Sequence, residues 1–197
     1  MQTTTHALIA LTGFQRKSVP RSGWVAVISS VLPDAFIAVF IPVTFARGIS
    51  AQQAFDVEFF NEPWATIGAI SNSFPLWSLV LVAGVILRSR NQQAGKLVTV
   101  GALSGLAHLV VDFFTHATDA HRHLWPISNW RFESPFSYWE VEHHANFVMP
   151  IEGAIGLVAV KLLWPRTTSK LQRIGLVLVG VVAVALLVSP IIRLAGS

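Results

Sequence analysis

The sequence contains no cysteine. Disulfides, iron–sulfur clusters and thiolate zinc sites are therefore excluded, and any metal must be held by histidine, aspartate, glutamate or asparagine. Charge is also scarce, because 12% of the residues are Asp, Glu, Lys or Arg, against about 25% in a typical soluble domain. With a mean hydropathy of +0.58, this composition indicates a membrane protein.

The chain also lacks a basic segment at its start and any internal repeat. Met1–Leu11 contains no Lys or Arg, so it has no n-region of a secretory signal peptide, and we expect it to belong to the mature protein. His6 therefore stays among the candidate functional residues. The missing repeat is an argument against a transporter built from two related halves.

Five apolar stretches are each long enough to cross a hydrocarbon core of about 30 Å, for which about 20 residues suffice. They are predicted at Ser22–Ala46, Ala65–Leu87, Lys96–His116, Asn146–Trp164 and Leu171–Leu194, with a short apolar helix at Thr4–Phe14 in front. Pro33 is expected to kink the first stretch and free a backbone carbonyl. The prediction is an all-α, polytopic transmembrane bundle of five or six membrane helices, forming a single membrane-embedded domain over residues 1–197.

Basic residues gather in three of the connecting loops and carboxylates in the other two. The basic loops hold Arg16, Lys17 and Arg21, then Arg88, Arg90 and Lys96, then Lys161, Arg166, Lys170 and Arg173. Because positive loops stay in the cytoplasm, the long loop at about 117–145 is expected on the extracytoplasmic side. The net charge of +4 is thus interpreted as a topology signal and not as a nucleic-acid surface, so the expected partner is the lipid bilayer.

Ionisable residues inside apolar runs are costly, by at least about 2.5–3.5 kcal/mol on insertion scales, and usually mark function. They are Asp34, His108, Asp112 and Glu152. His108, Asp112 and His116 are spaced i, i+4 and i+8, which places them on one helix face. Counted at about 1.5 Å per residue from the nearest basic loop, His6, Asp34, His108 and Glu152 all lie about 14–20 Å deep. Four helices are therefore predicted to bring ionisable groups together near the middle of the membrane.

Imidazole and carboxylate ligands suit a divalent metal, zinc as the first choice and manganese as the second. The predicted ligands are His6, Asp34, His108, Asp112, His116 and His144, and Asp34, Glu152 and His144 are the candidate catalytic groups. Among the histidines of the outer loop, His144 or His143 is favoured over His121 and His123. A hydrogen-bonded network or a proton relay without metal stays open as the alternative.

Several short motifs carry a resemblance. They are Thr5-His6, Leu32-Pro33-Asp34, His108-x-x-x-Asp112-x-x-Thr115-His116, Leu124-Trp125-Pro126 and Trp130-Arg131-Phe132. In order and spacing, the chain resembles the bacterial inner-membrane family of membrane-bound metal-dependent hydrolases, one member of which is described as LexA-binding. The resemblance implies a multi-pass protein of the bacterial inner (cytoplasmic) membrane. More distantly, the order of histidines and carboxylates is similar to that of zinc-dependent phospholipase C and single-strand nucleases, which implies phosphoester hydrolysis.

The chain departs from the family at two places. The family usually has a second Asp after Pro-Asp and a His-Arg-Gly-x-Thr-His-Ser element in the next helix, whereas this chain has Asp34-Ala35-Phe36 and Ser71-Asn72-Ser73-Phe74. Asn72 would replace a family histidine, which leaves open whether it is a ligand.

The expected function is a membrane-embedded metal-dependent hydrolase that acts on a phosphoester bond in a lipid or other amphiphilic substrate. A proton- or metal-ion-translocating protein that uses the same His/Asp/Glu cluster is the alternative. A scaffold for a protein partner is a third hypothesis, for which the cluster would be dispensable.

Overall fold

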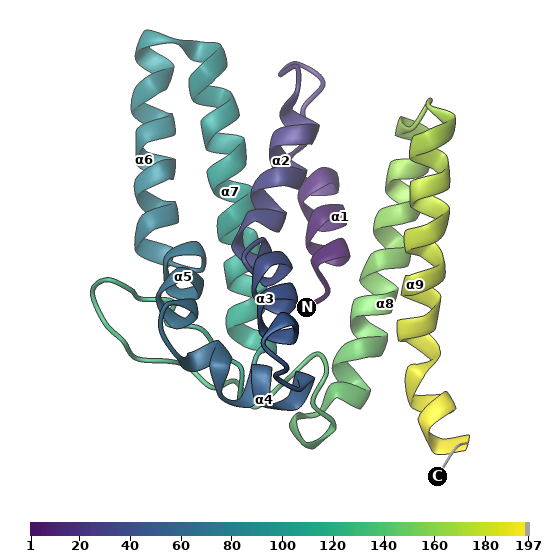
Figure 1. Ribbon diagram of the computed structural model, residues 1–197. Helices are drawn as coiled ribbons and strands as arrows, with labels where there is room; N and C mark the ends of the chain where they lie inside the picture. The colour runs from purple at the N-terminus through teal and green to yellow at the C-terminus, as the bar shows by residue number, and fades with distance from the viewer. Residues whose placement is uncertain (196–197) are drawn as a thin grey trace.

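The computed structural model describes residues 1–195, and in this range the chain is helical without any strand (Figure 1). Five helical stretches are long and apolar enough to cross a membrane. They run over Ser22–Ala46, Trp64–Arg90, Gln92–Thr115, Ala145–Arg166 and Lys170–Ile191. The predicted all-α membrane bundle is therefore confirmed, with boundaries that differ from the sequence prediction by a few residues.

The helices divide these stretches further. In order they are α1 (Thr3–Phe14), α2 (Ser22–Val31), α3 (Ile37–Ala46), α4 (Ala51–Asp56), α5 (Trp64–Ser71), α6 (Phe74–Arg90), α7 (Gln92–Thr115), α8 (Ala145–Leu163) and α9 (Lys170–Ala195). Short 3₁₀ turns lie between them: η1 (Leu32–Asp34), η2 (Glu58–Phe60), η3 (Val141–His143) and η4 (Trp164–Arg166). At 12 residues, α1 is about 18 Å long and too short to cross the bilayer.

Helix α7 lies at the centre of the bundle, between α6 on one side and α1 and α2 on the other (Figure 1). Its buried positions are largely small residues, including Gly101, Ala102, Ser104 and Gly105, which let neighbouring backbones approach closely. Helices α8 and α9 form a second hairpin, which contacts α1 through α8. The loops α1–α2, α6–α7 and α8–α9 all lie at the same end of the bundle, here called the basic end (Figure 1).

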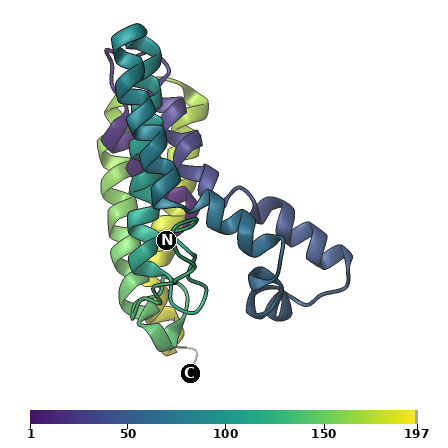
Figure 2. The same ribbon diagram turned by 90° about the vertical axis from the view of Figure 1, so that its left-hand side faces the viewer.

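Two of the membrane stretches are broken in the middle. The first breaks at η1, where Pro33 was expected to interrupt the helix, and the second breaks between α5 and α6. Beyond these breaks, α3, α4 and α5 project together from the side of the bundle (Figure 2). The breaks lie against each other, because Asn72 Nδ2 donates to the carbonyl of Pro33 at 3.3 Å and to that of Gly68 at 3.1 Å. Asn72 thus satisfies the carbonyl of Pro33, which the first break would otherwise leave unpaired.

Replacing Asn72 by alanine is expected to lower the free energy of unfolding by about 1–3 kcal/mol, because the buried carbonyl of Pro33 loses its side-chain donor. Thermal denaturation in detergent measures the change. Asn61→Ala is the matched control, since Asn61 is exposed. Equal melting temperatures for the two variants would show that the hydrogen bonds of the Asn72 side chain do not stabilise the fold.

Candidate metal centre

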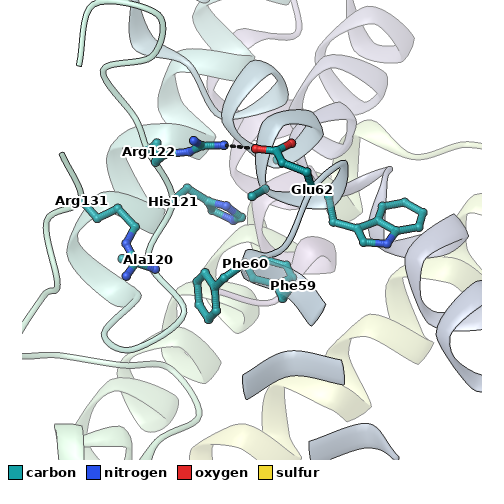
Figure 3. Close-up of a pocket in the computed structure, with 10 residues that line it drawn as sticks. Phe59, Phe60, Glu62, Ala120, His121, Arg122 and Arg131 are labelled. Carbon is teal, nitrogen blue, oxygen red and sulfur yellow. Dashed lines mark ion pairs between the residues drawn. The ribbon is translucent and has the colours of Figure 1, made fainter. Parts of the chain in front are cut away.

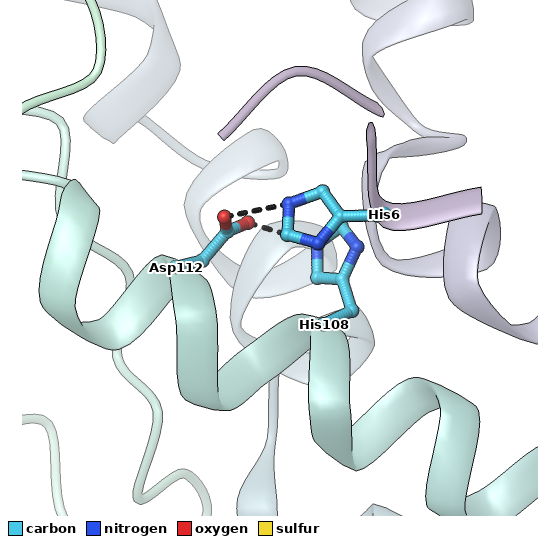
Figure 4. A group of neighbouring side chains, drawn as sticks. All are labelled: His6, His108 and Asp112. Atoms are coloured by element: carbon cyan, nitrogen blue, oxygen red, sulfur yellow. Dashed lines mark hydrogen bonds and ion pairs between the residues drawn. The ribbon is translucent and has the colours of Figure 1, made fainter. Parts of the chain in front are cut away.

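Three buried side chains meet near the middle of the bundle (Figure 4). His6 extends from α1, and His108 and Asp112 lie one turn apart on α7. His6 Nε2 is 2.9 Å from Asp112 Oδ1, and His108 Nε2 is 2.8 Å from Asp112 Oδ2. The candidate ligand atoms of the three residues all lie within 4.8 Å of one another. Tetrahedral zinc with ligands at 2.0–2.2 Å needs separations of about 3.3 Å, so this cluster could hold a metal ion after small shifts.

The surroundings of His108 give the strongest indication that a cation, either a proton on the ring or a metal ion, belongs at this cluster. Its Nδ1 lies 2.6 Å from the carbonyl oxygen of Ser30, which can only accept, so Nδ1 carries a hydrogen. Nε2 lies 2.8 Å from Asp112 Oδ2 but is not aimed at it, so this nitrogen is buried without a hydrogen-bond partner among the described residues. A ring nitrogen this close to the carboxylates of Asp34 and Asp112 is stabilised when a proton on the ring or a metal ion supplies positive charge. A carbonyl that orients a histidine through Nδ1 is also the usual support of a metal ligand.

His6 is held beside His108 by ring stacking, with centroids 3.8 Å apart and planes inclined by 28°. Both side chains are almost completely buried. The sequence prediction that the N-terminal histidine joins the intramembrane cluster therefore agrees with the geometry.

Asp34 borders the cluster from η1. Its Oδ1 lies 3.4 Å from His108 Nε2, and its Oδ2 accepts a hydrogen bond of 2.5 Å from Thr3 Oγ1. Asp34 is also the more accessible carboxylate, with a side chain 15% exposed against 1% for Asp112. It therefore lies where it could act as a further ligand, and it is more open to its surroundings than Asp112.

His116 continues the row of His108 and Asp112 towards the end of the bundle opposite the basic end, although α7 stops one residue before His116. Its Nδ1 lies 2.8 Å from Asp119 Oδ2 and its Nε2 lies 3.5 Å from Asp112 Oδ2. Burial alone would lower the pKa of His116, but the two carboxylates outweigh burial and raise that pKa to about 9. Burial would likewise raise the pKa of Asp119, and the bond with His116 instead lowers it.

Glu152 of α8 supports the start of α1. It accepts hydrogen bonds of 2.8 Å from the backbone amide of Gln2 and from Thr5 Oγ1, while its Oε2 is buried and unpaired among the described residues. The amino group of Met1, next to Gln2, lies 3.0 Å from Asp112 Oδ1. Glu152 is therefore linked to the cluster through the first turn of α1, and no direct bond joins it to the three central residues in the described part of the chain.

The structure does not bring His144 to the cluster. Its side chain is exposed at the start of α8, where a φ of 64° places the residue in the left-handed region, and its ring contacts Phe136 and Phe147. His121 and His123, which the sequence analysis ranked lower, are buried instead. The sequence signal is their i, i+2 spacing, which in an extended segment turns both rings to one side and Arg122 to the other.

Two cavities adjoin the part of the site around His116, and His121 lines both. One, of about 80 Å³, is also lined by Asp34 and His116. The other, of about 240 Å³, contains Arg122 and Arg131 (Figure 3). Burial, followed by the nearby His116, lowers the pKa of His121 to about 3, so this ring is neutral at physiological pH.

The fold and the site thus define a polytopic α-helical membrane protein with a buried His/Asp cluster that could bind a metal ion. Searches of protein-family models, curated proteins and solved structures find no match to this chain.

Proposed function

We propose that the chain is a metal-dependent hydrolase of the bacterial inner membrane, acting on a phosphoester bond in a lipid or other amphiphilic substrate. The observation that carries the proposal is the buried Nε2 of His108, which lies 2.8 Å from the Asp112 carboxylate, while Nδ1 of the same ring is bonded to the carbonyl of Ser30. His6, His108 and Asp112 form the core of the ligand set, with Asp34 and His116 at its edge. Zinc suits these nitrogen and oxygen ligands best.

Each residue has a distinct role in this proposal. When bound, the metal supplies Lewis acidity and activates water for attack on the phosphoester. Asp34 lines the 80 Å³ cavity and is placed to accept the proton of that water. Asp119 pairs with Nδ1 of the His116 ring, whose Nε2 lies 3.5 Å from Asp112 Oδ2.

The larger outer cavity favours an anionic substrate. Arg122 lies 3.6 Å from Glu62 and Arg131 lies 3.8 Å from Glu133, and both carboxylates are 62% exposed. Such long, solvated ion pairs are weak, and Arg122 adds only long hydrogen bonds of 3.3 Å to Asn129 and 3.4 Å to Thr66. A phosphate could therefore replace these contacts. Phe59 and Phe60 supply an apolar wall beside them, as an amphiphile requires (Figure 3).

A proton pathway is the second candidate, because one chain of close contacts runs from His108 through Asp112 and His116 to Asp119. Towards the basic end, however, the buried face of α7 continues with Ser104 and small or apolar residues, and Ser104 Oγ donates to the carbonyl of Val100. The chain of titratable groups therefore ends at the cluster, which favours a site reached from the outer side over a path through the membrane.

Metal analysis combined with a hydrolysis assay tests the proposal. Detergent-purified protein is expected to contain near-stoichiometric zinc or manganese and to hydrolyse phospholipid in mixed micelles. Chelation should stop the reaction, and returning the metal should restore it. Folded protein that binds neither metal when both are supplied in excess would move the assignment to the proton pathway.

Removing the charges of the outer cavity is expected to weaken substrate binding. Arg122→Gln and Arg131→Gln should each raise KM for an anionic phospholipid roughly tenfold to a hundredfold, the effect of one charged hydrogen bond, with little change in metal content. Arg47→Gln is the matched control, because Arg47 pairs with Glu58 on the same side of the bundle and does not line the cavity. An equal rise in KM for Arg47→Gln would show a general charge effect instead.

A further inference from the structure

A second cavity system lies at the basic end, away from the candidate metal centre. Its main cavity has a volume of about 510 Å³ and opens between α1 and α2 on one side and α8 and α9 on the other. The inner wall is apolar and is formed by Leu8, Leu11, Leu163, Leu176 and Val179. Leu8, Leu163 and Leu176 belong to the buried cluster that joins α1 to α8 and α9. The cavity therefore reaches the packing core of these helices.

The rim of the cavity is strongly positive. Four basic side chains line it: Arg16, Lys17, Arg21 and Arg166. No carboxylate lines it, and the sequence has no Asp or Glu before Asp34 or after Glu152. Arg16 and Arg166 donate to backbone carbonyls, of Gly13 and Gln15 and of Thr12 respectively, which orders the guanidinium groups without neutralising their charge. A second opening of about 520 Å³ shares Arg16, Lys17 and Arg166, so the positive region is continuous.

We infer that this cavity binds one anionic phospholipid of the leaflet at the basic end. An acyl chain lies along the leucine wall, and the phosphate lies among Arg16, Lys17 and Arg166. The apolar wall and the four uncompensated cations match the two halves of such a lipid. Arginine is suited to phosphate because its planar guanidinium donates two parallel hydrogen bonds, and basic pockets between membrane helices bind acidic headgroups. The inference is independent of the hydrolase proposal, because it concerns the opposite end of α1 from the metal centre.

A lipid in this position would support α1. Helix α1 carries His6 at its other end, and Leu8 and Leu11 of the same helix line the cavity. The bound lipid would fill the space between α1 and the α8–α9 hairpin, where the helices themselves leave a cavity. The lipid is thus a structural ligand, and not a substrate.

Native mass spectrometry of the full-length protein in detergent tests this site with phosphatidylglycerol and phosphatidylcholine of identical acyl chains. The wild type is expected to retain phosphatidylglycerol about tenfold more strongly, as one or two charged hydrogen bonds to phosphate provide. The triple variant Arg16→Gln/Lys17→Gln/Arg166→Gln should bind the two lipids equally. Equal binding of both lipids by the wild type would overturn the inference.

The matched control removes the same charge from the same end of the bundle. Arg88→Gln/Arg90→Gln/Lys96→Gln changes the adjoining ends of α6 and α7, which do not line the cavity, and it should leave the preference for phosphatidylglycerol intact. An equal loss in this control would show that the basic end attracts anionic lipid without a built site.

A charge-neutral pair of variants covers the case in which the triple variant fails to fold. Gly175→Leu places a side chain at a lining position where nothing lies within 4 Å of the added Cβ, so it should occlude the cavity without a clash. Gly180→Leu, on the same helix with the same free space but outside the lining, is its control. Lipid retention should fall about tenfold for Gly175→Leu alone. Unchanged retention would contradict a lipid in this cavity.

Discussion

Replacing Asp112 by asparagine is expected to lower metal affinity by at least about 100-fold and to abolish hydrolysis. Removing a residue that only hydrogen-bonds to a metal ligand already lowers affinity by about 10–100-fold, and removing the ligand itself should cost more. Asp112 is the centre of the cluster, with one carboxylate oxygen near Met1 and His6 and the other near His108 and His116. Asparagine keeps the size of the side chain and one acceptor but removes the charge that a divalent cation needs. Elemental mass spectrometry of the purified variant beside the wild type measures the loss.

The control for this prediction is His144→Ala. The sequence made His144 a candidate ligand and base, whereas its exposed side chain contacts Phe136 and Phe147. Metal content and activity should therefore stay at the wild-type level in His144→Ala. Retention of metal by Asp112→Asn would remove the cluster as a metal site, and loss of metal in His144→Ala would show that the outer loop folds onto the cluster.

Much of the centre could be predicted because helices have a fixed rise and period. The i, i+4 spacing of His108 and Asp112, together with depth counted from the basic loops, is sufficient to place both near His6 and Asp34, and the structure has these contacts. The depth of a residue along its helix does not determine which neighbouring helix its side chain faces. Glu152 lies at the predicted level but bonds to the first turn of α1, because its position around α8 could not be derived from its distance along that helix.

The remaining parts depend on irregular backbone. The outer loop has no helical period over most of its length, so the burial of His121 and the exposure of His144 could not be ranked from spacing. The partner of His108 Nδ1 is a main-chain carbonyl, that of Ser30, and every residue has one. The sequence offers Asn72 only as a replaced ligand, and its bond to the carbonyl of Pro33 depends on two helix breaks meeting in space.

The close packing of α6 on α7 leads to the second large prediction. A Cβ added at Gly105 would lie 2.5 Å from the ring of Trp77. That ring is not free to move, because its Nε1 donates a 2.9 Å hydrogen bond to the carbonyl of Ser71 at the break before α6. Gly105→Leu should therefore destabilise the protein by about 1–3 kcal/mol, which lowers the melting temperature by roughly 2–12 °C. Gly180→Leu, with nothing within 4 Å of its added Cβ, should leave the melting temperature unchanged.

Added zinc separates this packing effect from damage to the metal centre. A ligand that binds only the folded state raises the melting temperature, by an amount that grows with the logarithm of its concentration relative to its Kd. Gly105→Leu leaves His6, His108 and Asp112 in place, so zinc should still stabilise it, whereas Asp112→Asn should show no stabilisation by zinc. If zinc fails to stabilise Gly105→Leu while stabilising the wild type, the contact between Gly105 and Trp77 also positions His108, three residues further along α7. If Gly105→Leu melts with the wild type, the ring of Trp77 can leave its carbonyl partner at little cost, and the close approach of α6 and α7 is not what holds α7 at the centre of the bundle.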